Sequence, residues 1–254
     1  MRKLFPVALV SILVLLIPST SGAITNGEPD GNAHPMVGML AFYDDDGTYS
    51  HRCTGTLMSA TVVLTASHCT DGMSSARAYF DSEVTADYPE GEGGVVGTPF
   101  THPDFNPNTL FNDVAVVELV RDPGVAGPYP ALPSQGFLSG LKRQHDLQDD
   151  RFVVVGYGGV PGSPPPNIEF DLIRRQAVST YGGLMRNNLH LQQNPNPDDA
   201  GGTCFGDSGG PTFWKRTLKV VAVTSWGDAI CRANSMTQRL DTASALGFLE
   251  DHGL

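Results

Sequence analysis

The sequence predicts an all-β fold, because its apolar residues come in short runs that are rich in β-branched side chains and are separated by turn-forming residues. Examples of such runs are 61–64, 114–117, 152–155 and 220–223. A stretch without hydrophobic periodicity, 124–133, lies between the first two runs and the last two. We therefore expect two packed antiparallel β-structures joined by this crossing segment.

The end of the chain contains the best helix candidate. Residues 242–251 place apolar side chains at 245, 246 and 249, and Thr242 or Asp241 can cap the first turn. We therefore expect a helix over about 242–251, after the second β-structure.

The first 23 residues have the pattern of a secretory signal peptide. Arg2 and Lys3 give a positive start, residues 4–17 are apolar, and residues 19–23 are small. The apolar run is too short to span a bilayer. We expect residues 1–23 to be removed on export, which leaves a secreted chain, 24–254, without a membrane segment.

The charge of the chain argues against some classes of partner. It has 16 basic and 27 acidic residues, which give a net charge of −11 at pH 7. A polyanion is a poor ligand for nucleic acid and for anionic lipid surfaces. We therefore expect neither as a partner.

The four cysteines are Cys53, Cys69, Cys204 and Cys231. In a secreted chain they are expected to form two disulfides, for which three connectivities are open. No two of them are two to four residues apart, which argues against a zinc site. We expect neither a metal nor a cofactor.

The most informative segment is 206–211, Gly-Asp-Ser-Gly-Gly-Pro, which presents Ser208 in a turn with few side chains. A serine hydroxyl is a weak nucleophile until a base takes its proton, and glycines let the attacked carbonyl approach backbone N–H groups. Two earlier segments contain the other groups that such chemistry needs, His68 in 65–69 and Asp113 in 111–116. The three residues together predict a serine nucleophile.

Residues 206–210 also match the Gly-x-Ser-x-Gly pattern of an α/β-hydrolase. A nucleophile elbow follows a buried strand and opens a helix, and its histidine comes later in the chain. Here the serine follows a polar loop, 194–202, and precedes Pro211, and the only later histidine is His252 near the C-terminus. The context excludes the elbow.

These segments resemble the chymotrypsin/trypsin family of serine endopeptidases, and the resemblance extends from Ile24 to the C-terminus. It implies two packed antiparallel six-stranded β-barrels, about 24–125 and 134–240, and a C-terminal helix. His68 and Asp113 would lie on the first barrel, Ser208 on the second, and the active site between them. Five more segments take part in the resemblance: 24–27, 53–57, 101–106, 156–158 and 225–227.

The resemblance also implies roles for the motif residues. Ser208 would attack the scissile carbonyl, His68 would accept its proton, and Asp113 would orient the imidazole. The N–H groups of Gly206 and Ser208 would form the oxyanion hole. The family pattern pairs Cys53 with Cys69 and Cys204 with Cys231. Two departures, Ser67 for alanine and Tyr157 for tryptophan, remove no catalytic group.

In this family the α-amine of the mature N-terminus pairs with the aspartate before the nucleophile, here Ile24 with Asp207. Relatives that are kept inactive usually have Arg or Lys before this isoleucine, whereas Ala23 stands here. We therefore expect removal of the signal peptide itself to activate the enzyme.

The resemblance implies an uncharged specificity pocket, because Gly202 stands where a trypsin has aspartate; the alternative is that Asp228, or Asp198 and Asp199, supplies negative charge. An uncharged pocket favours a large apolar or aromatic residue before the cleaved bond, the P1 residue. The residues that the resemblance assigns to substrate binding are Gly202, Thr203, Ser225, Trp226, Gly227 and Ser235.

We expect a monomer that cleaves proteins or peptides and that protein inhibitors can block. Two alternatives belong to other classes. A binding protein on a catalytically silent protease scaffold would usually lack one of the three catalytic residues, and this chain has all three. A serine esterase would cleave small esters but not peptides.

Overall fold

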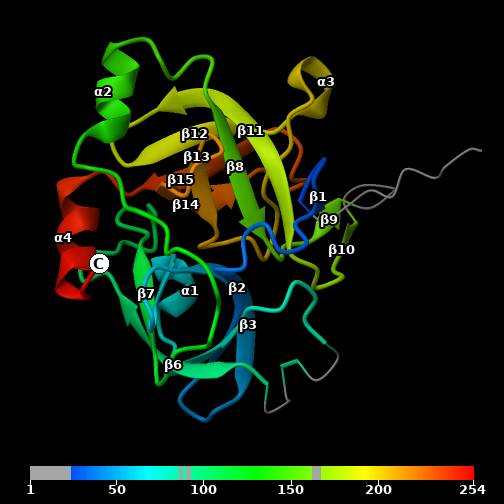
Figure 1. Cartoon of the computed structure of the whole chain (residues 1–254), viewed down its shortest axis with the longest axis vertical. Helices are drawn as coiled ribbons and strands as arrows, with labels where there is room; N and C mark the ends of the chain where they lie inside the picture. The colour runs from blue at the N-terminus through cyan, green and yellow to red at the C-terminus, as the bar shows by residue number, and fades with distance from the viewer. Residues whose placement is uncertain (1–23, 86–87, 90–92, 162–166) are drawn as a thin grey trace, which may run out of the picture.

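The computed structural model describes residues 24–85, 88–89, 93–161 and 167–254, and the expected signal peptide, 1–23, lies outside them. The strands form two closed antiparallel barrels of six strands each (Figure 1). The predicted fold class is therefore confirmed. Within the described residues, no helix has the length and apolar composition that crossing a membrane requires.

The first barrel has the strand order β2-β3-β4-β7-β6-β5. Its interior is filled by alternating apolar side chains, which belong to one continuous core cluster. Its strands are β2 (Val37–Tyr43), β3 (Tyr49–Leu57), β4 (Val62–Thr65), β5 (Ser75–Tyr79), β6 (Val95–Thr101) and β7 (Ala115–Leu119).

The second barrel has the order β11-β12-β15-β14-β13-β8 and closes through pairing of β8 with β11. Its strands are β8 (Arg151–Gly156), β11 (Arg175–Leu184), β12 (Asn188–Gln192), β13 (Pro211–Trp214), β14 (Val220–Gly227) and β15 (Asn234–Arg239). A separate two-stranded ribbon is formed by β9 (Val160–Pro161) and β10 (Ile168–Glu169).

The N-terminal segment of the described chain lies against the second barrel, and the C-terminal helix lies against the first (Figure 1). Strand β1 (Glu28–Pro29) pairs with β11 of the second barrel, although its residues precede the first barrel. Helix α4 (Ala243–Asp251) lies beside β7, where His252 bonds Glu118 at 2.8 Å. Its cap is Thr242, whose side chain accepts the N–H of Ala245 at 3.2 Å. The two chain ends therefore tie the barrels together.

Three short helices were not anticipated. They are α1 (Ser67–Thr70), α2 (Phe137–Arg143) and α3 (Pro195–Asp198). Helix α2 is held by tertiary contacts rather than by its own sequence, which contains Gly140. Leu138 is buried beneath it, and the N–H of Leu138 donates to Asp241 at 2.9 Å.

A fully buried arginine, Arg174, joins the two barrels just before β11. Its Nε donates to Asp30 at 3.0 Å, and its Nη1 donates to the carbonyls of Val37 and Phe80 at 3.1 and 3.0 Å. Nη1 also donates to the hydroxyl of Tyr157 at 3.2 Å. Because these partners come from the N-terminal segment and from both barrels, Arg174 fixes the barrels relative to one another.

Candidate active site

A buried carboxylate holds His68 at two points. His68 lies in α1, directly after β4, and Asp113 lies just before β7 and is fully buried. Oδ1 of Asp113 accepts the backbone N–H of His68 at 2.8 Å, and Oδ2 accepts Nδ1 at 2.8 Å. Ser225 also donates to Oδ2. An ionised carboxylate only accepts, so the ring proton is on Nδ1 and Nε2 is free to accept another.

Ser208 lies in a tight turn that precedes β13. Gly206 and Gly209 adopt φ of 96° and 76°, and a Cβ on Gly209 would lie 2.1 Å from the hydroxyl of Thr65. Thr54 of β3 fixes the turn from the first barrel: its N–H donates to the Ser208 carbonyl at 2.8 Å, and its hydroxyl donates to the Gly206 carbonyl at 2.9 Å. The serine is therefore positioned by both barrels.

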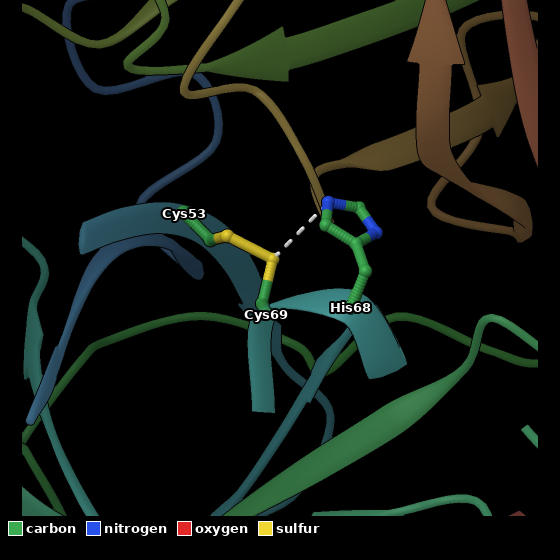
Figure 2. Close-up of side chains that lie close together, drawn as sticks. All are labelled: Cys53, His68 and Cys69. Carbon is green, nitrogen blue, oxygen red and sulfur yellow. Dashed lines mark hydrogen bonds between the residues drawn. A yellow bond between two sulfur atoms is a disulfide. The ribbon is translucent and has the colours of Figure 1, made fainter. Parts of the chain in front are cut away.

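His68 and Ser208 line the same cavity, which has a volume of about 290 Å³. Nε2 of His68 lies 3.7 Å from Sγ of Cys69 (Figure 2). Within the described chain no hydrogen bond joins Nε2 to the hydroxyl of Ser208. Catalytic hydrogen bonds are often long in the absence of substrate and tighten when it binds.

Cys53, His68 and Cys69 form the cluster drawn in Figure 2. Their ligand atoms lie within 4.8 Å of one another, which is a spacing found at metal sites. Both sulfurs, however, belong to the Cys53–Cys69 disulfide, so no thiolate is available as a ligand. The Cys53–Cys69 disulfide instead ties the segment that contains His68 to β3. The second disulfide joins Cys204 to Cys231, and both of its residues line the cavity.

Asp207, directly before Ser208, is fully buried. Its carboxylate accepts the N–H of Gly158 at 2.7 Å and that of Cys204 at 2.8 Å. A Cβ on Gly158 would lie 2.3 Å from Oδ2, and one on Gly156 would lie 2.1 Å from Oδ1. The two glycines around Tyr157 therefore make room for this carboxylate.

Burial raises the pKa of Asp207 to about 7, and the two backbone N–H groups only partly oppose this rise. In the described residues Asp207 forms no ion pair. Ile24 is fully buried, and its neighbour Thr25 exchanges two backbone hydrogen bonds with Gly202, at 2.8 and 2.9 Å. The N-terminal residues therefore approach the segment that contains Asp207, although the Ile24 nitrogen is in a peptide bond in the full-length chain.

The residues expected to bind substrate divide into two groups. Thr203, Ser225, Trp226 and Gly227 line the cavity. Gly202 and Ser235 are buried behind this lining, where Ser235 bonds the hydroxyl of Thr203 at 2.7 Å.

One residue of this region was not anticipated from the sequence. Gln193 is fully buried against Gly202, and a Cβ on Gly202 would lie 2.1 Å from its Oε1. A glutamine after a short strand has no distinctive sequence pattern, so no local signal indicates this position.

Comparisons with known proteins all point to one family. The Trypsin family model matches residues 24–244. Serine protease 1 of Drosophila melanogaster is 30% identical over 223 residues, which cover 84% of this chain and 78% of that protein. Trypsin, alkaline B, of Manduca sexta is 26% identical over 225 residues, which cover 85% of each. The solved structure of HL collagenase has a TM-score of 0.66 at 21% identity and covers 90% of this chain and 97% of that one.

The two closed six-stranded antiparallel barrels have the fold of a two-barrel serine protease, and His68 and Ser208 line one cavity while Asp113 lies behind His68. The chain belongs to the trypsin family and is a serine-type endopeptidase, whose substrates are proteins or peptides. The resemblance seen in the sequence is thereby confirmed.

Proposed function

We propose that Ser208 is the nucleophile of this endopeptidase, that His68 is its general base, and that Asp113 orients the base. The N–H groups of Gly206 and Ser208 form the oxyanion hole. Within the described chain neither N–H donates to another backbone group, so both are available to a ligand. The proposal rests above all on the two-point contact of Asp113 with His68, beside the cavity that Ser208 also lines.

The reaction follows from these positions. The hydroxyl oxygen of Ser208 adds to the peptide carbonyl carbon while its proton passes to Nε2 of His68. The resulting oxyanion accepts hydrogen bonds in the oxyanion hole, where one such donor lowers the barrier by about 3 kcal/mol. The C–N bond then breaks as the leaving amine takes the proton from Nε2. Water, deprotonated by His68, hydrolyses the acyl-enzyme and releases Ser208.

We propose further that export activates the enzyme. In the precursor the charged form of Asp207 is disfavoured by burial. Cleavage before Ile24 would supply an α-ammonium group that pairs with it. An ion pair inside the protein stabilises the ionised carboxylate and, through it, the turn that holds Ser208. The signal-peptide pattern of residues 1–23 supports a secreted, extracellular enzyme.

The substrate is proposed to carry a large apolar or aromatic P1 residue. Gly202, behind the lining of the cavity, supplies no charge, and Trp226 and the Cys204–Cys231 disulfide form apolar walls. Asp228, which also lines the cavity, accepts the N–H groups of its own loop, at Arg232, Ala233 and Asn234. We propose a monomer without a metal or cofactor that protein inhibitors can block.

The test is the intact mass of the secreted protein before and after treatment with an organophosphonate that labels activated serines. We expect one label on a chain that begins at Ile24, and no label on Ser208→Ala. An unlabelled chain beginning at Ile24 would indicate a silent scaffold. An unlabelled longer chain would indicate a precursor that needs another cleavage. Labelling with cleavage of small esters but of no peptide would indicate an esterase.

A further inference from the structure

Ser67, which directly precedes His68, is a fully buried serine at the start of α1. Its hydroxyl donates to the carbonyl oxygen of Val114 at 2.7 Å, and it also points to the carbonyl oxygen of Asn112 at 3.3 Å. These two carbonyls belong to the residues on either side of Asp113. The hydroxyl therefore joins the segment that contains His68 to the backbone that carries Asp113.

The segment that contains Asp113 lies outside the regular strands. Strand β7 begins after it, and Asn112 has a φ of 57°, which is an uncommon conformation for a residue other than glycine. The N–H of Asp113 donates to Oε1 of Gln238 at 3.3 Å, which is longer than a typical N–H···O bond. The bond from Ser67 to Val114, in contrast, has the usual length of a hydroxyl hydrogen bond. This bond is therefore well placed to fix the backbone beside Asp113.

The hydroxyl of Ser67 also accepts a hydrogen bond. The backbone N–H of His102 donates to Oγ of Ser67 at 3.2 Å, and His102 is itself buried, with its ring 5.0 Å from that of Phe248 in α4. Ser67 thus uses its proton and a lone pair in bonds to two different segments. An alanine at position 67, as is usual in the family, would remove the partner of the His102 N–H and of the Val114 carbonyl, and removing one partner of a buried hydrogen bond is unfavourable.

We infer that Ser67 is a positioning residue, which holds Asp113 against His68 through the backbone on both sides of the aspartate; this rests on the catalytic roles proposed above. Asp113 accepts the backbone N–H and Nδ1 of His68 at 2.8 Å each, so a displacement of the aspartate backbone changes both contacts. Loss of the hydroxyl weakens the hold on the base and lowers the rate of proton transfer. It leaves substrate binding intact, because the cavity is lined by other residues of the described chain.

The test is Ser67→Ala, assayed by steady-state hydrolysis of a peptide substrate. Active sites are counted by complete labelling with the organophosphonate, so that unfolded protein does not enter kcat. We expect kcat to fall about tenfold at unchanged KM, since small displacements of catalytic groups have effects of this order. The proton on Nδ1 of His68 lies in a hydrogen bond to a carboxylate and resonates at low field in proton NMR. We expect this resonance to move to higher field in Ser67→Ala.

The matched control is Thr237→Val. Thr237 is a fully buried residue of β15, and its hydroxyl donates to the carbonyl of Leu189 at 3.0 Å within the second barrel. This variant also loses a buried hydroxyl-to-carbonyl bond, so it should lower the stability toward urea. We expect it to leave kcat and the Nδ1 resonance unchanged, because the lost bond does not involve the segments of His68 or Asp113.

An unchanged kcat and an unmoved resonance in Ser67→Ala, or a rise in KM alone, would overturn this inference and leave the endopeptidase mechanism in place. Equal falls in kcat in Ser67→Ala and Thr237→Val would overturn it as well, because lost stability would then account for both. Absence of both labelling and cleavage in the natural chain would overturn the proposed function and this inference with it.

Discussion

Asp113 contacts His68 through both carboxylate oxygens, one bonded to the backbone N–H and one to Nδ1, each at 2.8 Å. The backbone contact fixes where the first turn of α1 begins, and the ring contact fixes the tautomer. Ser225 of β14 donates to the same carboxylate, so the second barrel also positions a group on the first. The orientation of the base therefore depends on both barrels.

Asp113→Asn is expected to lower kcat by about 10⁴-fold with little change in KM, because an amide can donate to Nδ1 and so favours the wrong tautomer. The measurement is steady-state hydrolysis of a peptide substrate. Asp122→Asn, on an exposed turn, is the control and should be fully active. Near-normal kcat in Asp113→Asn would contradict the role given to this carboxylate.

The stability of the precursor is expected to fall as pH rises. The pKa of Asp207 is raised to about 7, from an ordinary value of 3.8 in the unfolded chain. Between these values the folded state holds a proton that the unfolded state has released, so the free energy of unfolding decreases with rising pH and levels off above pH 7. At about 1.4 kcal/mol per pH unit the loss is about 4 kcal/mol.

Urea unfolding of Ser208→Ala chains at several pH values between 4 and 8 measures this effect without self-digestion. A chain beginning at Ile24 should lack this decrease, because its free α-ammonium group stabilises the ionised carboxylate. Asp207→Asn should remove the decrease from the full-length chain. Identical profiles for the two chain lengths would show that Ile24 does not pair with Asp207.

Local patterns in the sequence indicated four of the strands, β4, β7, β8 and β14, and the C-terminal helix. The two-barrel arrangement and the substrate-binding residues followed from the family resemblance instead. Local patterns were insufficient for Gln193 and Arg174, which look like surface residues at the edge of a strand. Their burial depends on tertiary contacts: Arg174 bonds Asp30, 144 residues earlier, and Gln193 packs on Gly202 across the loop that follows it. Helix α2 was missed for the same reason, since its position is set by Asp241.

Arg174→Met is expected to lower the free energy of unfolding by about 3–5 kcal/mol, because it removes the buried ion pair with Asp30 and the donors to several carbonyls. Arg174→Lys should recover little of this, since one ammonium group cannot reach partners on several sides. The adjacent Arg175 provides a matched control, because its partner Asp171 is exposed and such a pair contributes at most about 1 kcal/mol. Urea unfolding in the Ser208→Ala background measures all three variants. Equal losses for Arg174→Met and Arg175→Met would show that Arg174 does not hold the two barrels together.

Gly202→Asp alone is expected to impair the enzyme rather than to convert it to cleavage after Arg or Lys. The new Cβ would lie 2.4 Å from the Cβ of Gln193 and 2.1 Å from its Oε1, so the side chain has no space. Gln193→Gly removes both of these atoms, and the double variant should therefore accept the carboxylate and gain activity toward arginine at P1.

The comparison is kcat/KM for arginine and tyrosine substrates in the two single variants and the double variant. Because the residues are in contact, their effects should be strongly non-additive. Equal gains toward arginine in Gly202→Asp and in the double variant would show that Gln193 does not exclude a side chain at position 202.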